Sequence, residues 1–147
     1  MTYRVYFEDV EVGQELPPFV RTTDFMNWNR YASVNDEFTF THMDDDYCRA
    51  KLGLPGAIGM GNLRLAYVVN MLQEWAGDET DIREASIEFR GMNHKNDTLR
   101  ATGRVIDKQT VDGEHLVRIA TDVLNQHGAG TAPGQAVVVL PSRAELR

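Results

Sequence analysis

Cysteine, basic charge and long apolar runs are all scarce in this 147-residue chain. Its single cysteine, Cys48, excludes an internal disulfide framework and a thiol-rich zinc site. The 15 lysines and arginines are outnumbered by 22 aspartates and glutamates, and the resulting formal net charge of −7 argues against nucleic acid as the main ligand. No apolar run approaches the roughly 20 residues that a membrane span needs, and the first residues lack the basic tip and apolar stretch of a signal peptide. We therefore expect a cytoplasmic protein with neither a nucleic-acid nor a membrane partner.

The chain does contain enough apolar material for a packed core. Hydrophobic residues make up 42% of the sequence and charged residues 25%, which is typical of a globular domain and not of a disordered chain. No internal repeat and no proline- or glycine-rich linker divides the sequence. We therefore expect residues 1–147 to form a single domain.

The first half of the chain has helical periodicity. A helix is predicted from Asp24 to Val34, capped by Thr23, and a second short helix from Asp44 to Leu52. The longest periodic segment runs from about Gly59 to Ala76, and Gly77 is suited to end it. Its apolar residues recur at helical spacing: Leu65, Val68, Val69, Leu72, Trp75 and Ala76. Because the helix is apolar nearly all round, we expect it to be buried on most sides.

After Gly77 the apolar period changes to two, which is typical of half-buried strands. Asp112-Gly113 is a hairpin signal between two of these strands, and Gly103, in an apolar position, is interpreted as a bulge. The predicted strand segments are 85–89, 99–105, 115–124 and 135–140. One long apolar helix followed by antiparallel strands predicts an α+β fold with the sheet packed on that helix.

The loop from Asn35 to His42 holds the residues best suited to chemistry. Asp36, Glu37 and His42 lie within eight positions. A carboxylate and a neutral histidine can together hold a water molecule and pass protons in both directions, as hydration or dehydration beside a carbonyl requires. The plainer alternative is that Asp36 caps a turn and His42 makes a structural hydrogen bond.

Motifs around this loop resemble those of the MaoC-like, (R)-specific enoyl-CoA hydratase family of hotdog-fold proteins. His42-Met43-Asp44 matches the H-x-D of the family's D-x-N-P-x-H-x-D motif, and Gly53-Leu54-Pro55 matches the turn that follows it. Gly59-Met60-Gly61-Asn62 stands where A-H-G-M opens the family's central helix. The segments YFEDVEVGQEL and FRGMNHKNDTLRATGRV also resemble family segments, so the similarity extends from about residue 6 to residue 140. It implies a hotdog fold, an antiparallel sheet wrapped around one long central helix.

The resemblance implies a catalytic carboxylate–histidine pair, with His42 as the histidine. In the family the two residues are five positions apart, whereas Asp36 precedes His42 by six positions and Glu37 by five. We favour Asp36, because a one-residue loop insertion costs little and the longer glutamate would displace the water. Glu37 remains the alternative. The Asn-Pro pair of the motif is absent, and Met60 stands where the family often has a second histidine.

The start of the long helix is the expected thioester site, formed by Gly59, Met60, Gly61 and Asn62. Free backbone N–H groups at a helix N-terminus can stabilise the enolate oxygen of the transition state, and a glycine lets the thioester approach closely. The alternative for Gly61 is simple helix-entry geometry. Phe40, together with Phe38 and Met60, would contact an apolar acyl group unless these residues belong to the core.

The family resemblance also bears on cofactors and partners. It implies an acyl-CoA thioester substrate, no metal or redox cofactor, and a homodimer or a heteromer with another MaoC-like chain. The run Asp44-Asp45-Asp46 is better explained by helix capping than by a cation site. The leading hypothesis is a hydratase/dehydratase. The alternative is a catalytically silent hotdog subunit that binds acyl-CoA or a partner chain, and a hotdog thioesterase is a third, weaker hypothesis.

Overall fold

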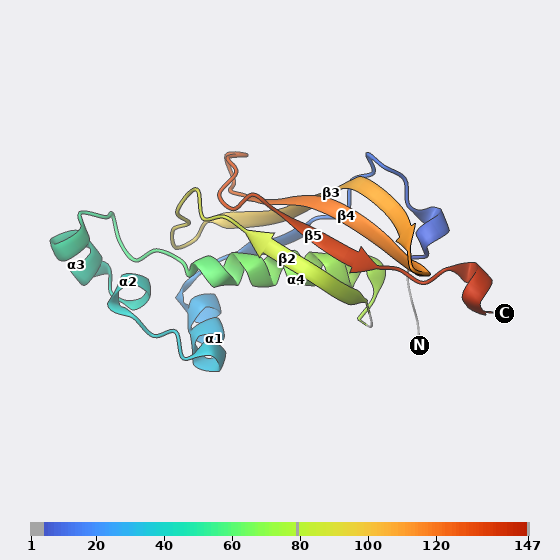
Figure 1. The fold of residues 1–147 in the computed structure, drawn as a ribbon. Helices are drawn as coiled ribbons and strands as arrows, with labels where there is room; N and C mark the ends of the chain where they lie inside the picture. The colour runs from blue at the N-terminus through green and yellow to red at the C-terminus, as the bar shows by residue number, and fades with distance from the viewer. Residues whose placement is uncertain (1–4, 79, 147) are drawn as a thin grey trace.

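The computed structural model describes residues 5–78 and 80–146, and at its centre a curled antiparallel sheet lies over one long helix (Figure 1). The sheet has five strands in the order β1-β3-β4-β5-β2, and each adjacent pair is antiparallel. The strands are β1 (Phe19–Thr22), β2 (Asp81–Ile87), β3 (Thr98–Val111), β4 (Glu114–Leu124) and β5 (Gly134–Val139). The α+β prediction, with the sheet wrapped around a central helix, is confirmed.

The central helix, α4 (Gly61–Ala76), starts two residues later than the periodicity predicted and ends where it predicted. Gly77 follows it with a φ of 113°, a conformation that favours glycine, and its N–H donates to the Gln73 carbonyl at 2.8 Å. The side of α4 that packs on the sheet is fully apolar in its second half, where Met71, Leu72, Trp75 and Ala76 are buried. No helix among residues 5–78 and 80–146 is long and apolar enough to cross a membrane.

The hairpin between β3 and β4 is confirmed at Asp112-Gly113, where both residues have positive φ. The interpretation of Gly103 as a bulge is wrong. The register shift falls between Val105 and Asp107 instead. The absence of a side chain at Gly103 allows close packing in the core. A Cβ there would lie 2.9 Å from the Met71 side chain and 3.1 Å from that of Ile119.

Helix α1 (Phe25–Asn35) is also confirmed, but its predicted cap is wrong. Asp24 accepts a hydrogen bond from the Asn27 N–H at 2.7 Å and caps the helix. Thr23 is fully buried, and its hydroxyl donates to the Asp97 carbonyl at 3.2 Å. Thr23 therefore joins α1 to the loop before β3.

Residues 36–58 form what we call the overhanging segment, which projects beyond the N-terminal end of α4 (Figure 1). The predicted helix from Asp44 to Leu52 is divided here. It consists of α3 (Asp45–Tyr47) and a π-helical turn (Cys48–Leu52), preceded by the short α2 (Phe40–Met43). Several short helices in succession let the chain leave the end of α1 and return to the start of α4.

Candidate active site

His42, at the end of α2, is held by the backbone of the overhanging segment. Its Nδ1 lies 2.8 Å from the Ile58 carbonyl oxygen, and the Ile58 N–H donates to the Thr41 carbonyl at 3.1 Å. Because a carbonyl oxygen can only accept, Nδ1 carries the proton of this hydrogen bond. In the neutral ring Nε2 is then unprotonated and free to accept a proton.

His42 lies on the wall of an open cavity of about 460 Å³ at the N-terminal end of α4. Glu37 is the only carboxylate among the described residues that line this cavity. A larger hollow of about 550 Å³ lies elsewhere, over β3 and β4, and contains none of the predicted site residues. The residues lining the His42 cavity are Glu37, His42, Ile58, Gly59, Gly61, Asn62, Arg64, Phe89, Arg90, Gly91 and Met92.

The two candidate carboxylates differ in position. Asp36 ends α1 in the left-handed conformation, with φ at 52°, and is exposed outside the cavity. Glu37 is half-buried and shares the cavity with His42. Burial raises the pKa of the nearby Tyr31, and the negative charge of Glu37 raises it further. Of the two candidate carboxylates, Glu37 and not Asp36 therefore lines the cavity that His42 also lines.

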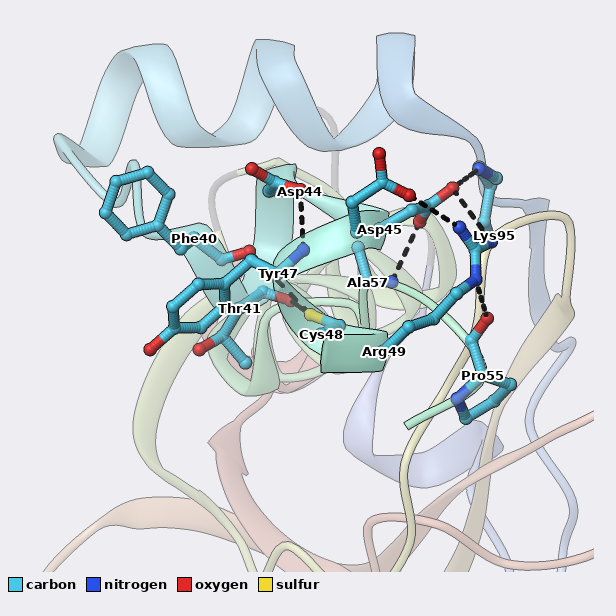
Figure 2. A network of polar contacts seen from close by, with 11 residues as sticks. Phe40, Thr41, Asp44, Asp45, Tyr47, Cys48, Arg49, Pro55, Ala57 and Lys95 are labelled. Atoms are coloured by element: carbon cyan, nitrogen blue, oxygen red, sulfur yellow. Dashed lines mark hydrogen bonds and ion pairs between the residues drawn. The ribbon is translucent and has the colours of Figure 1, made fainter. Parts of the chain in front are cut away.

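Three of the four residues predicted at the start of α4 line the cavity: Gly59, Gly61 and Asn62. Met60 does not, because its side chain is fully buried in the core. Phe40 also lies outside the cavity and stacks on Tyr47, with ring centroids 5.2 Å apart (Figure 2).

Both glycines at this helix start are closely covered by other side chains. A Cβ on Gly61 would lie 2.5 Å from the tip of the Phe89 ring, and a Cβ on Gly59 would overlap the Asn93 amide. The Gly59 N–H donates to the Asn93 carbonyl at 2.8 Å. The Phe89 ring, although 59% exposed, therefore stands over the N-terminus that was predicted to meet the thioester.

Sequence reasoning missed Arg64, Phe89 and Asn93. Arg64 is 4% exposed, and the side-chain amide of Asn93 is buried with no hydrogen-bond partner among the described residues. A charged residue within the apolar run of α4 was the one available signal for Arg64. Phe89 was assigned to a strand, but β2 ends at Ile87.

The acidic run of the overhanging segment has structural contacts (Figure 2). Asp44 accepts the Tyr47 N–H at 2.8 Å and caps α3. Asp45 accepts from the Lys95 ammonium at 2.7 Å and from the Ala57 N–H at 2.9 Å. The described residues contain no cluster of three side chains suited to hold a metal ion.

Cys48 is buried in the same segment, with its Sγ 3.3 Å from the Thr41 carbonyl oxygen (Figure 2). Burial raises the pKa of this thiol, so that it stays protonated near neutral pH. Cys48 therefore helps to pack the overhanging segment.

Comparisons with solved structures find close matches to the fold. The R-hydratase PhaJ1 from Pseudomonas aeruginosa superposes with a TM-score of 0.86 at 22% identity, covering 96% of this chain and 88% of that one. The (R)-hydratase from A. caviae involved in PHA biosynthesis gives 0.78 at 20% identity, covering 91% and 99%. A chain of the ChsH1-ChsH2 complex from Mycobacterium tuberculosis gives 0.77 at 20% identity, covering 89% and 98%. These similarities establish the hotdog fold that the sequence motifs implied.

No curated protein matches the sequence. The family model described as the MaoC-like domain matches residues 11–127, which is most of the chain and includes the cavity. The chain therefore belongs to the MaoC-like domain family.

Proposed function

We propose that this protein is a hydratase/dehydratase that adds water to an enoyl thioester and removes it in the reverse direction. The observation that carries the proposal is that His42 and Glu37 line the same cavity at the N-terminus of α4. His42 has its Nδ1 bound to a carbonyl and its Nε2 available. The structural neighbours include an R-hydratase and a MaoC-like dehydratase, which supports the same reaction class.

The proposed reaction needs only these groups and a water molecule. Glu37 and His42 Nε2 hold the water, and one of them takes a proton as the water oxygen bonds to the β-carbon. The double-bond electrons move onto the thioester oxygen, where backbone N–H groups at Gly61 and Asn62 stabilise the negative charge. The α-carbon then receives a proton from the pair, so that one O–H bond of water and the π bond of the alkene are replaced by one C–O and one C–H bond.

Glu37 is the carboxylate we propose for this role, in place of the Asp36 favoured from the sequence. The five-residue spacing to His42 and the shared cavity both support it. The matched test compares Glu37→Gln with Asp36→Asn in an absorbance assay over a panel of enoyl thioesters. We expect Glu37→Gln to lose roughly 10²–10⁴-fold in rate and Asp36→Asn to keep most of it. The reverse pattern would assign the role to Asp36, and full activity in both variants would refute the pair.

The second candidate function is a silent subunit that acts with another MaoC-like chain. The Phe89 ring next to Gly61 favours it, because the ring occupies space that a thioester at the helix N-terminus would approach. One structural neighbour, the ChsH1-ChsH2 complex, is built from two different chains. The test mixes this chain with a catalytic MaoC-like chain. If the complex keeps full activity with His42→Ala, the working site lies on the partner.

We also propose that a second copy, or another MaoC-like chain, covers the outer side of α4. Leu65, Ala66 and Val69 on this side are half-exposed, and together with Tyr31 they line a hollow of about 430 Å³. Apolar surface of this kind favours association. Light scattering is expected to give at least twice the 16.6 kDa of the chain, and Val69→Glu is expected to shift the mass toward the monomer. A monomer at micromolar concentration would contradict the proposal.

A further inference from the structure

Arg64 is a buried cation on the wall of the candidate active site. It is 4% exposed and lines the same cavity as His42 and Glu37. Its Nη1 donates to the carbonyls of Gly91 and Thr131 at 2.6 and 2.9 Å. These bonds fix the guanidinium between α4 and the two loops that supply the carbonyls.

The part of the chain that the structure describes offers no acceptor to the rest of the Arg64 guanidinium. Among the described residues, Nε and Nη2 make no hydrogen bond, and no carboxylate lies within 4.0 Å to form an ion pair. The Phe89 ring is 5.2 Å away and offers only its face. A guanidinium stays charged at any physiological pH, and a buried charge without a partner is costly. The site therefore holds a positive charge that the described part of the chain leaves unpaired.

Two nearby carboxylates do not supply the missing partner. The charge of Asp122 does act on Arg64, but its Oδ1 accepts the N–H groups of Val123 and Ala132 at 2.7 and 3.1 Å. Glu37 lines the cavity without forming an ion pair to Arg64. Burial outweighs Asp122 and lowers the pKa of the Arg64 guanidinium, as expected for a cation whose charge is not fully compensated.

We propose that Arg64 binds a carboxylate on the acyl group, so that the substrate is the monothioester of a short unsaturated dicarboxylic acid. The inference rests on the proposed function. A carboxylate matches the planar guanidinium with paired hydrogen bonds. Gly61 and Arg64 are three residues apart on α4, so they share a face and lie about 4.5 Å apart along the helix axis. The Phe89 ring also borders both positions: a Cβ on Gly61 would lie 2.5 Å from its tip, and the Arg64 guanidinium carbon lies 5.2 Å from its centroid. A thioester at Gly61 and a carboxylate at the Arg64 guanidinium therefore suit a short acyl chain, for which we take about four carbons.

The test compares two thioesters of pantetheine that differ at one end. The crotonyl group ends in a methyl where the fumaryl group of the same length ends in a carboxylate. We expect the wild-type protein to favour the fumaryl thioester in kcat/KM, and Arg64→Met to lower that preference by roughly 10²-fold. Arg100→Met, which removes an exposed arginine of β3 outside the cavity, is the matched control and leaves the preference unchanged.

Two results would overturn the inference: a wild-type preference for the crotonyl thioester, or an equal loss on both thioesters in Arg64→Met. The second result would mean that Arg64 acts on a part common to both substrates. If Arg64→Met does not fold, Arg64→Lys takes its place. It keeps the charge but loses the paired geometry, and a reduced fumaryl preference is again the expected result.

Binding separates this inference from the proposed function. Calorimetry with both thioesters on the His42→Ala background requires no turnover. Tighter fumaryl binding that is lost with Arg64→Met supports the carboxylate site even if the wild-type protein hydrates neither compound. Equal affinity for the two thioesters refutes the site, whether or not hydration is observed.

Discussion

The two ends of α4 have different environments. At the C-terminal end Leu72, Trp75 and Ala76 are buried among apolar neighbours, and Gly77 closes the helix with a backbone hydrogen bond. At the N-terminal end lie two glycines, a buried guanidinium without an ion-pair partner and the Asn93 amide without a hydrogen-bond partner, as far as residues 5–78 and 80–146 show. Buried polar groups without a hydrogen-bond partner are rare in folded proteins, so each needs an explanation. Under the proposed function, the C-terminal end of the helix stabilises the fold and the N-terminal end binds and converts the substrate.

The largest expected effect concerns chemistry at the N-terminal end. His42→Ala is expected to lower the hydration rate by roughly 10²–10⁴-fold, because in the proposed mechanism the imidazole holds and activates the water. Its free energy of unfolding should change by less than about 1 kcal/mol, since one half-exposed hydrogen bond is lost. Steady-state assays and urea unfolding measure the two quantities. His127→Ala, in the exposed turn before β5, is the control and should change neither.

The C-terminal end should show the opposite behaviour. Leu72→Ala is expected to lower the free energy of unfolding by about 2–5 kcal/mol, because the fully buried side chain leaves a cavity in the core. The rate of the protein that remains folded should be nearly unchanged. Met26→Ala on α1, where the side chain is 61% exposed, is the control and should cost less than about 1 kcal/mol. A strong loss of hydration rate in the folded Leu72→Ala variant would show that the C-terminal end of α4 also affects activity.

A smaller effect tests the ring that covers the N-terminus. Gly61→Ala forces the Phe89 ring away, and because that side chain is exposed and can rotate, the stability cost should stay within about 1 kcal/mol. Activity should fall by roughly tenfold if the added methyl blocks the thioester. Phe89→Ala alone should lower KM, because it uncovers Gly61. An unchanged KM would mean that the ring does not obstruct the site.

Gly134→Ala is the matched comparison for Gly61→Ala. Here the new Cβ would meet the backbone of Ser86, which cannot rotate away. The free energy of unfolding should therefore fall by roughly 2–3 kcal/mol. Urea unfolding of the two alanine variants measures this difference. It compares a side chain that can move, Phe89, with a strand backbone that cannot.

The smallest expected effect is a pH dependence in the overhanging segment. The hydrogen bond from Lys95, together with the Ala57 N–H, lowers the pKa of Asp45 below its ordinary value of about 3.9. A carboxyl group with a lowered folded-state pKa stabilises the fold fully above its unfolded-state pKa. That contribution is lost as the pH falls through about 4 toward the lowered folded-state value.

The melting temperature measured between pH 6 and pH 2 tests this. Asp45→Asn should have a lower melting temperature than the wild type at pH 6, and the two proteins should converge toward pH 2. Asp46→Asn, next in sequence and almost fully exposed, is the control. A constant difference between Asp45→Asn and wild type across this range would contradict the assignment.

Much of the fold follows from local patterns. The period of α4, the glycine after it and the Asp112-Gly113 turn all depend on residues close together in sequence, and the structure agrees at each of them. The predictions were wrong at positions whose role depends on contacts with residues distant in sequence. Thr23 was predicted to cap a helix, but it is buried against Asp97. Gly103 was predicted to form a bulge, but it packs closely against core side chains from α4 and β4.

The sequence by itself determined the α+β class from local periodicity, and its resemblance to family motifs indicated the hotdog fold and the MaoC-like family, because both signals lie in short stretches of the chain. It also predicted a site at the loop around His42, which stays a prediction. Only the tertiary structure decided what surrounds that histidine. The left-handed turn at Asp36 puts Glu37 on the cavity wall, a choice that sequence spacing left open. Arg64 and Phe89 reach the same cavity from segments far along the chain from His42. Long-range packing of this kind depends on the whole sheet and helix, so no local pattern in the sequence records it.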